Sequence, residues 1–443
     1  MKFGIQTWGS TGDIRPFIAL ATGLQAAGHD VTLYATDIDN RDYSEFAEKA
    51  GFAINHIATP VIEDPAELDR IGLACINAGN PLVQAKIIIN EMFLPVIEEM
   101  YEAALELCQN SDVVIRHFFL HPTQIAAEKF NVPEITVQMA HYTLPSRHLP
   151  APGLPNLGKW FYPFGWWLNR TALNTLFMPA INRMRGREGL PPAADLTTKV
   201  WSSGLLNLFA VSPSICLRPV DWEPRHQICG FLSIPDSSLS DELPPSISQF
   251  LDEGDKPIFI TFGSLMPKST GYFYEAIDLF RKAAQRANCR AIIQVPGDTI
   301  AALPVDRHIF YTATINHKII FPRCALVVHH GGAGTSHSTL LAGVPSVVVA
   351  HAADQFFWAS ELQRLGVAPK ILRIKSLTAE NLASRIGAVL HSPAMKDNAR
   401  RISAAMKDED GVAKAVELVE KFLTTTKTQR SQSLIKRKPR FHI

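Results

Sequence analysis

The sequence predicts an α/β protein made of two doubly wound parallel sheets that face each other across a cleft. With 443 residues, the chain exceeds the length at which one hydrophobic core stops growing, so we expect two domains of roughly 200 residues each. Short apolar strands alternate with helical segments in two separate series, which is typical of parallel sheets covered by helices on both faces. A Pro- and Ser-rich stretch without apolar periodicity, residues 234–248, lies between the series.

The first series predicts the N-terminal domain. It opens with a strand at residues 3–7, a loop at 8–15 and a helix that begins at Pro16, since proline suits a first helical turn. Gly28 is placed to end this helix. The later elements of the series are strands at 31–35, 113–115 and 135–137, and a helix at 122–130.

The second series predicts the C-terminal domain. Its elements are strands at 257–262, 291–295, 326–328 and 347–349, a glycine-rich turn at 329–334 and a helix at 335–342. The predicted division is therefore an N-terminal domain at 1–233, a linker at 234–248, a C-terminal domain at 249–423 and a basic, disordered tail at 424–443.

Charge and composition exclude several classes of protein. The chain has 43 Lys and Arg against 42 Asp and Glu, which excludes a nucleic-acid binder that relies on overall positive charge. No apolar run is long enough to span a bilayer, and the apolar start stops at Gln6, so we expect no signal peptide. The six cysteines include no CxxC pair, which fits reduced thiols in the cytoplasm. The tail carries six basic and no acidic residues; it is either a solvated tail or attracted to an anionic membrane surface.

The clearest chemical signal is the stretch His-His-Gly-Gly-Ala-Gly-Thr-Ser at residues 329–336, between a strand and a helix. Glycines let the backbone approach a ligand, and the free N–H groups and dipole of a helix start attract a diphosphate. Hydroxyls of Thr335 and Ser336 add donors, as does a histidine ring. A packing turn is the alternative for this stretch taken alone. It is not a Walker motif, because no Gly-Lys-Ser/Thr follows.

Polar residues also follow other strands of both domains. Asp354 and Gln355 come after the strand at 347–349, where their side chains suit sugar hydroxyls; a helix cap is the alternative for Asp354. Gly263 and Ser264 follow the strand at 257–262. Asp13 follows the first strand directly after Gly12, and is either a helix cap or a general base.

Three stretches of the chain resemble glycosyltransferase family 1: residues 9–16, 329–335 and 354–358. The likeness extends from Met1 to about Leu423 and is closest to the branch of sterol glucosyltransferases, glycopeptide-antibiotic glucosyltransferases and rhamnolipid rhamnosyltransferases. It implies a GT-B fold, with the nucleotide-sugar donor held by the C-terminal domain and the acceptor by the N-terminal one.

The resemblance also implies roles for individual residues. Asp13 would be the catalytic base, and Asp354 and Gln355 would bind the sugar hydroxyls. The remaining donor-binding residues would be Gly12, Gly263, Ser264, His330, Gly332, Gly334, Thr335 and Ser336. It implies no metal or other cofactor, because helix-terminal N–H groups neutralise the leaving diphosphate.

Two positions depart from the family pattern. Ile319 stands where relatives carry a Trp that shapes the nucleotide end, which leaves the nucleobase open. His351 stands where relatives commonly carry Pro, and it either touches the sugar or lies at the surface.

Candidates for the acceptor side are fewer. His117, His121 and His141 follow N-terminal strands and could line the acceptor site, with satisfied core or loop histidines as the alternative. We favour His141 among them. The aromatic cluster that starts at Trp160 is either a packed connection, or an acceptor-binding lip or interfacial patch.

We therefore expect an inverting glycosyltransferase that needs no metal. It would move a hexose from a UDP- or TDP-sugar, with UDP-glucose first, to a hydroxyl of a lipophilic molecule such as a sterol, polyketide or lipid. Its expected partners are these two substrates and no nucleic acid, and its expected location is the cytoplasm, either free or in peripheral contact with a membrane. The alternatives are a non-catalytic helper protein of the same fold and a nucleotide-sugar epimerase.

Overall fold

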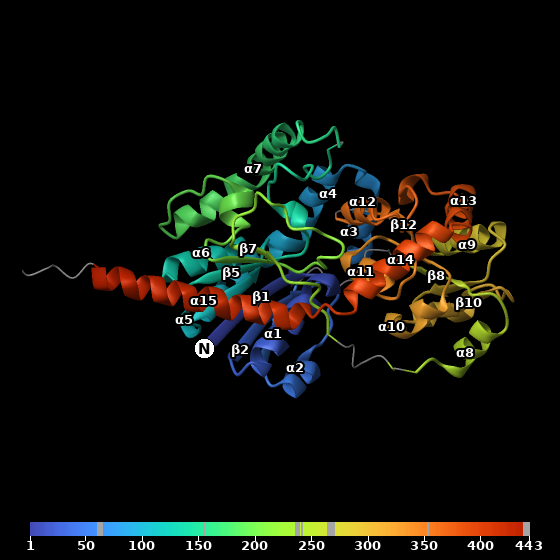
Figure 1. The fold of residues 1–443 in the computed structure, drawn as a ribbon, viewed down its shortest axis with the longest axis horizontal. Coiled ribbons are helices and arrows are strands. Elements are labelled where there is room, and N and C mark those ends of the chain that lie inside the picture. The colour runs from blue at the N-terminus through green and yellow to red at the C-terminus, as the bar shows by residue number, and fades with distance from the viewer. Residues whose placement is uncertain are drawn as a thin grey trace, which may run out of the picture.

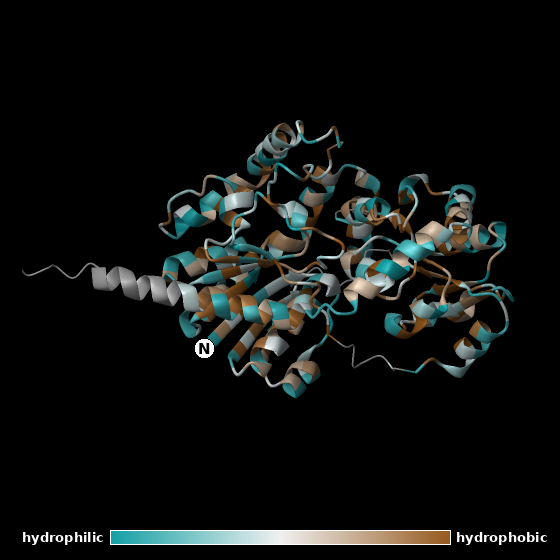
Figure 2. Ribbon diagram, viewed as in Figure 1, coloured by the Kyte–Doolittle hydropathy of each residue, from teal (hydrophilic) through white to brown (hydrophobic). Residues whose placement is uncertain are grey.

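The structure, a computed structural model, describes residues 1–59, 65–154, 156–234, 240, 242–263, 271–351 and 354–436. It consists of two parallel sheets of seven and six strands, each packed against helices (Figure 1). Hydrophobic residues gather on the strands and on the helix faces that cover them (Figure 2). The predicted α/β class with two doubly wound sheets is confirmed.

The first sheet has the strand order β3-β2-β1-β4-β5-β6-β7, with all pairs parallel. Its strands are β1 (Lys2–Gly9), β2 (Asp30–Asp37), β3 (Ala53–His56), β4 (Val113–His117), β5 (Glu134–Gln138), β6 (Leu206–Phe209) and β7 (His226–Ile228). The central strands are buried on both faces, as expected of a sheet between two helical layers.

The second sheet has the order β10-β9-β8-β11-β12-β13, again with all pairs parallel. Its strands are β8 (Ile258–Thr261), β9 (Ala291–Gln294), β10 (Ile309–Thr312), β11 (Val327–His329), β12 (Ser346–Ala350) and β13 (Leu372–Arg373).

The α-helices connect and cover these strands. Those before β8 are α1 (Thr11–Ala26), α2 (Ser44–Ala50), α3 (Pro65–Ala78), α4 (Pro81–Ile88), α5 (Ile97–Asn110), α6 (His121–Phe130), α7 (Tyr162–Arg187) and α8 (Pro245–Asp252). Those after β8 are α9 (Gly271–Arg286), α10 (His317–Ile320), α11 (Ala333–Leu341), α12 (Gln355–Arg364), α13 (Ala379–Leu390), α14 (Pro393–Met406) and α15 (Gly411–Lys436).

The strand order identifies where each sheet can bind a ligand. In the first sheet the order reverses between β1 and β4, and in the second between β8 and β11. In doubly wound sheets, ligands bind at the carboxyl ends of the strands that flank such a reversal. The residues to inspect are therefore those that end or follow these four strands.

The start of α1 corrects one expectation. The predicted loop extends to Arg15, but the helix begins at Thr11, with Ser10 as its N-cap and Asp13 in its first turn. A capping box between Ser10 and Asp13 allows this earlier start. Pro16 therefore lies inside the helix and not at its first position.

The final helix departs from the predicted domain division. α15 packs on α1, and Ala415, Val416, Val419 and neighbouring residues belong to the hydrophobic core of the first sheet. Figure 1 shows α15 running back along that sheet. Residues 411–423 therefore complete the N-terminal core and not the C-terminal one. Where the sequence predicts a disordered tail, α15 continues to Lys436. Residues 437–443 lie outside the described residues, as do residues 235–239 and 241 of the predicted linker.

The two domains share an apolar contact. One buried cluster combines Leu144, Phe209 and Trp222 of the first domain with Trp358 and Leu362 of the second. All six cysteines are free thiols. Among the helices described, none combines the length and the apolar composition that crossing a bilayer requires.

Candidate active site

Asp13 lies directly after β1, in the first turn of α1. Its Oδ2 accepts hydrogen bonds from the backbone N–H of Ser10 at 3.0 Å and from the Ser10 hydroxyl at 3.1 Å. These bonds fix the carboxylate at the helix start, where the helix dipole favours a negative charge. The side chain is 34% exposed, so a bound molecule can reach it.

His117 brings an imidazole next to this carboxylate. It is the last residue of β4, and its Nε2 lies 3.6 Å from Oδ1 of Asp13. Its Nδ1 accepts the N–H of Phe119 at 3.4 Å, which leaves Nε2 to carry the proton of the neutral ring. Nε2 is buried and has no hydrogen-bond partner within the described residues. An imidazole N–H and the carboxylate thus adjoin at the β1–β4 reversal.

Asp354 of the second domain interacts electrostatically with Asp13. Burial, and then the charge of Asp13, raise the pKa of Asp354 to about 6. Its Oδ2 accepts the indole N–H of Trp358 at 3.0 Å. Burial, followed by the charges of Asp354 and Asp13, also raises the pKa of Tyr142 well above its ordinary value. The two carboxylates, one from each domain, therefore lie within electrostatic range of each other.

At the reversal of the second sheet, His330 is enclosed by two glycines. A Cβ on Gly263, which has φ +75°, would lie 2.6 Å from the His330 ring, and a Cβ on Gly332 would lie 2.3 Å from its Nε2. Glycine is required at both positions, so that the loops after β8 and β11 can close around the imidazole. Ser264, the other residue predicted here, lies outside the described residues.

Next to His330, the start of α11 has backbone N–H groups that precede the first hydrogen bond within the helix. The first bond within the helix runs from the Ser336 N–H to the Gly332 carbonyl at 3.0 Å, so the N–H groups of Ala333, Gly334 and Thr335 precede it. Among the described residues, a Cβ on Gly334 would meet no atom within 4 Å. Such a helix start suits a diphosphate.

Ser336 does not fit its predicted role. It is completely buried, and its Oγ is a buried atom without a hydrogen-bond partner among the residues described. In this geometry its hydroxyl is not presented at the open end of α11. Thr335, one residue earlier, is half-buried and remains in place for a ligand contact.

Four histidines gather around this helix start in their neutral form. Burial lowers the pKa of His330 to about 4. Burial first, and then the proximity of His330, lowers the pKa of His317 to about 4 and that of His329 and His351 to about 3. Buried ring nitrogens of His329, His330 and His351 have no hydrogen-bond partner in the described part of the chain. The site therefore holds polar ring atoms that can gain a partner when an anion binds.

Gln355 is placed differently from the prediction that it binds sugar. It is buried, and its Oε1 accepts the N–H of His351 at 2.7 Å. The side-chain carbonyl therefore holds the backbone that leads to Asp354. His351 is likewise buried and not at the surface.

A group of aromatic rings adjoins His117 on the N-terminal side. Phe118 contacts the His117 ring at 4.7 Å between centroids, and Trp201 contacts Phe118 at 5.2 Å. Phe119 lies 5.8 Å from Trp8 and 6.0 Å from Phe177 of α7. Phe118, Phe119, Phe177 and Trp201 are only partly buried, which suits contact with an apolar molecule beside Asp13.

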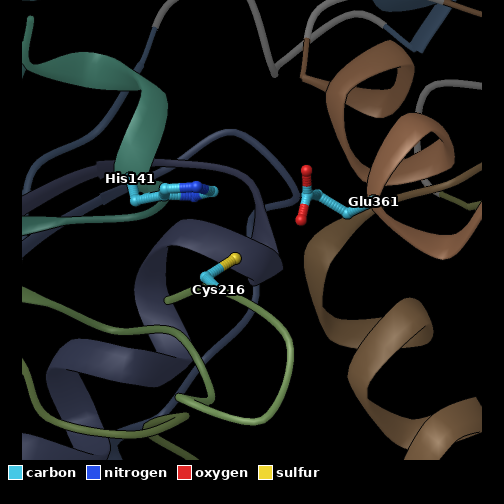
Figure 3. Close-up of side chains that lie close together, drawn as sticks. All are labelled: His141, Cys216 and Glu361. Carbon is cyan, nitrogen blue, oxygen red and sulfur yellow. The ribbon is translucent and has the colours of Figure 1, made fainter. Parts of the chain in front are cut away.

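His141, the favoured acceptor residue, lies elsewhere. Figure 3 shows its ring directed toward Cys216 and Glu361, and the potential ligand atoms of the three residues lie within 4.8 Å of one another. Arg364 already binds Glu361 Oε2 at 2.6 Å, and burial raises the Cys216 pKa well above its ordinary value. A cation would meet the Arg364 charge and a protonated thiol, so we interpret this cluster as a contact between domains.

Two further predicted residues lie at the surface. Trp160 is fully exposed just before α7, so its ring has none of the enclosure of an acceptor site. Gly12 is exposed in the first turn of α1, beside Asp13.

The pairing of His117 with Asp13 is the main feature that sequence reasoning missed. His117 is predicted only as one of several residues that line the acceptor site. The neighbouring places of β1 and β4 in the sheet bring it to Asp13. A strand-order argument applied to the sequence could have found this pair.

Comparisons with known proteins identify relatives of the whole chain. Residues 291–422 match the family described as erythromycin biosynthesis protein CIII-like, C-terminal domain. The chain is 30% identical over 447 residues to O-mycaminosyltylonolide 6-deoxyallosyltransferase of Streptomyces fradiae, across 97% of this chain and 99% of that relative. It is 30% identical over 442 residues to a sterol 3-beta-glucosyltransferase of Arabidopsis thaliana, across 96% of this chain and 66% of that relative.

The fold has solved counterparts as well. The crystal structure of the glycotransferase of kitacinnamycin covers 95% of this chain and 98% of its own length, with a TM-score of 0.66 and 16% identity. The similarity to the Streptomyces relative over nearly the whole chain, with the C-terminal family match and this shared fold, shows that the chain belongs to family 1 of the GT-B glycosyltransferases.

Proposed function

We propose that this enzyme inverts the anomeric centre of a hexose as it moves the sugar from a nucleoside diphosphate to a hydroxyl of a lipophilic molecule. The observation that carries the proposal is the position of Asp13, beside His117 and within electrostatic range of Asp354. The proposed base of the N-terminal domain thus lies close to the proposed sugar-binding residue of the C-terminal domain.

In this mechanism the carboxylate of Asp13 takes the proton of the acceptor hydroxyl. The hydroxyl oxygen then attacks the anomeric carbon from the face opposite the diphosphate, which leaves with the bonding electron pair. The Nε2–H of His117, 3.6 Å from Oδ1, would orient the carboxylate once the two come within hydrogen-bond distance, and the bonds from Ser10 hold its other oxygen. General-base assistance of this kind is typically worth about 10²–10⁴-fold in rate.

The leaving diphosphate would be stabilised by the start of α11. Its free N–H groups, the Thr335 hydroxyl and the His330 ring are fixed before the reaction, so they stabilise developing charge without reorganisation. Asp354 would accept hydrogen bonds from the sugar hydroxyls, with its position set by Trp358. We propose that these groups serve in place of a metal ion.

The acceptor class follows from the rings beside His117. Phe118, Phe119 and Trp201 suit an apolar ring system whose hydroxyl points at Asp13. One relative is named for a sterol acceptor and another for a tylonolide derivative, which supports the same class. UDP-glucose is our first choice of donor. The six free cysteines support the predicted cytoplasmic location.

The test is a thermal-shift panel of UDP-, TDP- and GDP-sugars in EDTA, followed by an acceptor screen with the best donor. We expect stabilisation by a nucleotide sugar without added metal, and transfer to a sterol or polyketide alcohol. Stabilisation that requires magnesium or manganese would contradict the metal-independent donor site.

A further inference from the structure

The N-terminal part of α7 exposes a row of large apolar side chains that the active site does not use. Trp160, Phe164, Trp167 and Leu168 are 100%, 53%, 59% and 42% exposed, and Leu157 just before them is 64% exposed. The spacing of 164, 167 and 168 places these three side chains on one face of α7, and Trp160 lies in the turn directly before the helix. We call the five residues the outer α7 face; α7 lies at the upper edge of the molecule in Figure 1.

Side chains on the opposite side of the first turns of α7 anchor this helix to the domain. Trp166 is buried, and its indole N–H donates to the Leu149 carbonyl at 2.9 Å. Tyr162 is buried as well, and its hydroxyl donates to Asn156 Oδ1 at 2.8 Å. The fold therefore fixes this helix without help from the outer face. Contiguous exposed apolar side chains of this kind mark an interaction surface.

The chain segment that contains the outer α7 face is basic in sequence. From residue 135 to residue 187 the chain has no Asp or Glu but six Arg and Lys. Arg170, Arg185 and Arg187, farther along α7, pair with acidic groups from other segments. Lys159 is exposed directly before Trp160, and Arg147 is exposed two residues before Leu149, whose carbonyl accepts the Trp166 indole N–H. The backbone N–H of Arg147 donates to Asp221, but the side chains of Lys159 and Arg147 form no ion pair within the described residues. A surface of tryptophan and phenylalanine edged by free cations complements an anionic lipid bilayer.

We propose that the outer α7 face docks on an anionic membrane surface. Trp160, Phe164 and Trp167 enter the headgroup region, while Lys159 and Arg147 contact anionic headgroups. Docking by rings on a rigid helix gives a defined orientation, which a basic tail alone does not.

The same helix reaches the acceptor side of the enzyme. Phe177, farther along α7, contacts both Phe119 and Trp201, which belong to the aromatic group beside His117. α7 thus links the outer α7 face to the rings beside His117, and the proposal extends to delivery of a membrane-held acceptor to this side of the enzyme. This second step rests on the proposed lipophilic acceptor, whereas the docking itself does not.

Flotation with phosphatidylcholine vesicles that contain phosphatidylserine tests the docking, with no donor or acceptor present. The triple variant Trp160→Gln, Phe164→Gln, Trp167→Gln should lose at least tenfold in vesicle partition and keep its melting temperature. The matched control Leu217→Gln, Val220→Gln, Val305→Gln changes three other exposed apolar residues, which are 72%, 81% and 102% exposed, and should bind as the parent does.

Charge variants test the second half of the proposal. Lys159→Gln and Arg147→Gln should each weaken binding to the anionic vesicles roughly fivefold, and added salt should weaken it in the parent. Binding to pure phosphatidylcholine should change little.

Three results would overturn the proposal. The first is a triple variant that binds vesicles as well as the parent does. The second is a triple variant that no longer forms a concentration-dependent dimer of the parent but still binds lipid. The third is a variant with the six basic tail residues replaced by Gln that loses all vesicle binding, while the triple variant keeps its vesicle binding. Because none of these readouts involves sugar transfer, they are independent of a failure of the proposed activity.

Discussion

Replacement of Asp13 by Asn separates its role as a base from its role in the helix start. The amide oxygen of Asn can still accept the N–H of Ser10, which Asp13 Oδ2 now accepts at 3.0 Å. The variant loses the favourable interaction of a negative charge with the helix dipole, about 0.3–1 kcal/mol, so the fold should survive.

The catalytic loss should be far larger than this structural one. An amide cannot accept the acceptor's proton, so kcat should fall by about 10²–10⁴-fold, which corresponds to about 2.7–5.5 kcal/mol of activation free energy. Donor affinity should change little. Removal of the Asp13 charge should also lower the pKa of Asp354 from about 6 toward its ordinary value, because that charge is its second-largest cause after burial.

The assay is nucleoside-diphosphate release at saturating donor and acceptor, with donor affinity measured by calorimetry. Asp39→Asn is the matched control, because Asp39 Oδ2 also accepts bonds at this helix start, from the N–H and hydroxyl of Thr11 at 2.8 and 2.6 Å. The control should keep most of its activity. A folded Asp13→Asn variant that binds donor and retains more than a tenth of the parent rate would refute the assignment of Asp13 as the base.

Three other predictions concern the histidines. His330→Ala should weaken binding of the free nucleoside diphosphate by roughly 10- to 150-fold, because it removes a hydrogen bond to a charged group worth about 1.5–3 kcal/mol. An unchanged dissociation constant in calorimetry would show that the diphosphate binds elsewhere. His117→Leu should lower kcat by roughly 10- to 150-fold as well, with little change in donor affinity. His117→Gln keeps an N–H donor and should recover part of this loss in kcat. Full activity of the leucine variant would show that His117 takes no part in the mechanism. Eight described histidines have a pKa lowered to about 3 or 4 in the folded state. In the unfolded chain a histidine has a pKa of about 6.5, so below that pH the unfolded chain binds more protons than the folded one. The free energy of unfolding should therefore fall as pH drops from 6.5 toward 4. Asp37 and Asp354 have a pKa raised to about 6 and so stabilise the fold as pH drops, but they are two groups against eight histidines. A free energy of unfolding, measured in urea, that does not change between pH 7 and pH 5 would contradict the prediction.

The sequence predicts the strands of this fold better than its helices. The buried runs at β4, β5, β9 and β12 lie within a residue or two of their predicted ranges, because continuous apolar runs bounded by turns are typical of parallel strands. α15 could not be assigned to the first sheet, since its partner α1 is almost the whole chain away in sequence.

The site was predictable in its residue types and less so in its contacts. Asp13 follows β1 in the first sheet, and His330 and Asp354 follow the neighbouring strands β11 and β12 in the second, so a motif and a strand count suffice to place them at the carboxyl ends of strands. The burial of Ser336 and Gln355 depends on how α11 and α12 pack, which no local pattern specifies. His141 illustrates the same limit: its place after β5 is correct, but tertiary packing directs its ring to Cys216 and Glu361.

The stereochemistry of the transferred sugar tests the central claim most directly. The measurement is proton NMR of the anomeric centre in the product made from an α-linked nucleotide sugar and the acceptor found in the screen, with a donor-only reaction alongside. Inverting transfer with Asp13 as base predicts a β-linked product, formed in equal amount to the released nucleoside diphosphate, and no new sugar nucleotide in the donor-only reaction. An α-linked product, or a new sugar nucleotide without acceptor, would contradict it.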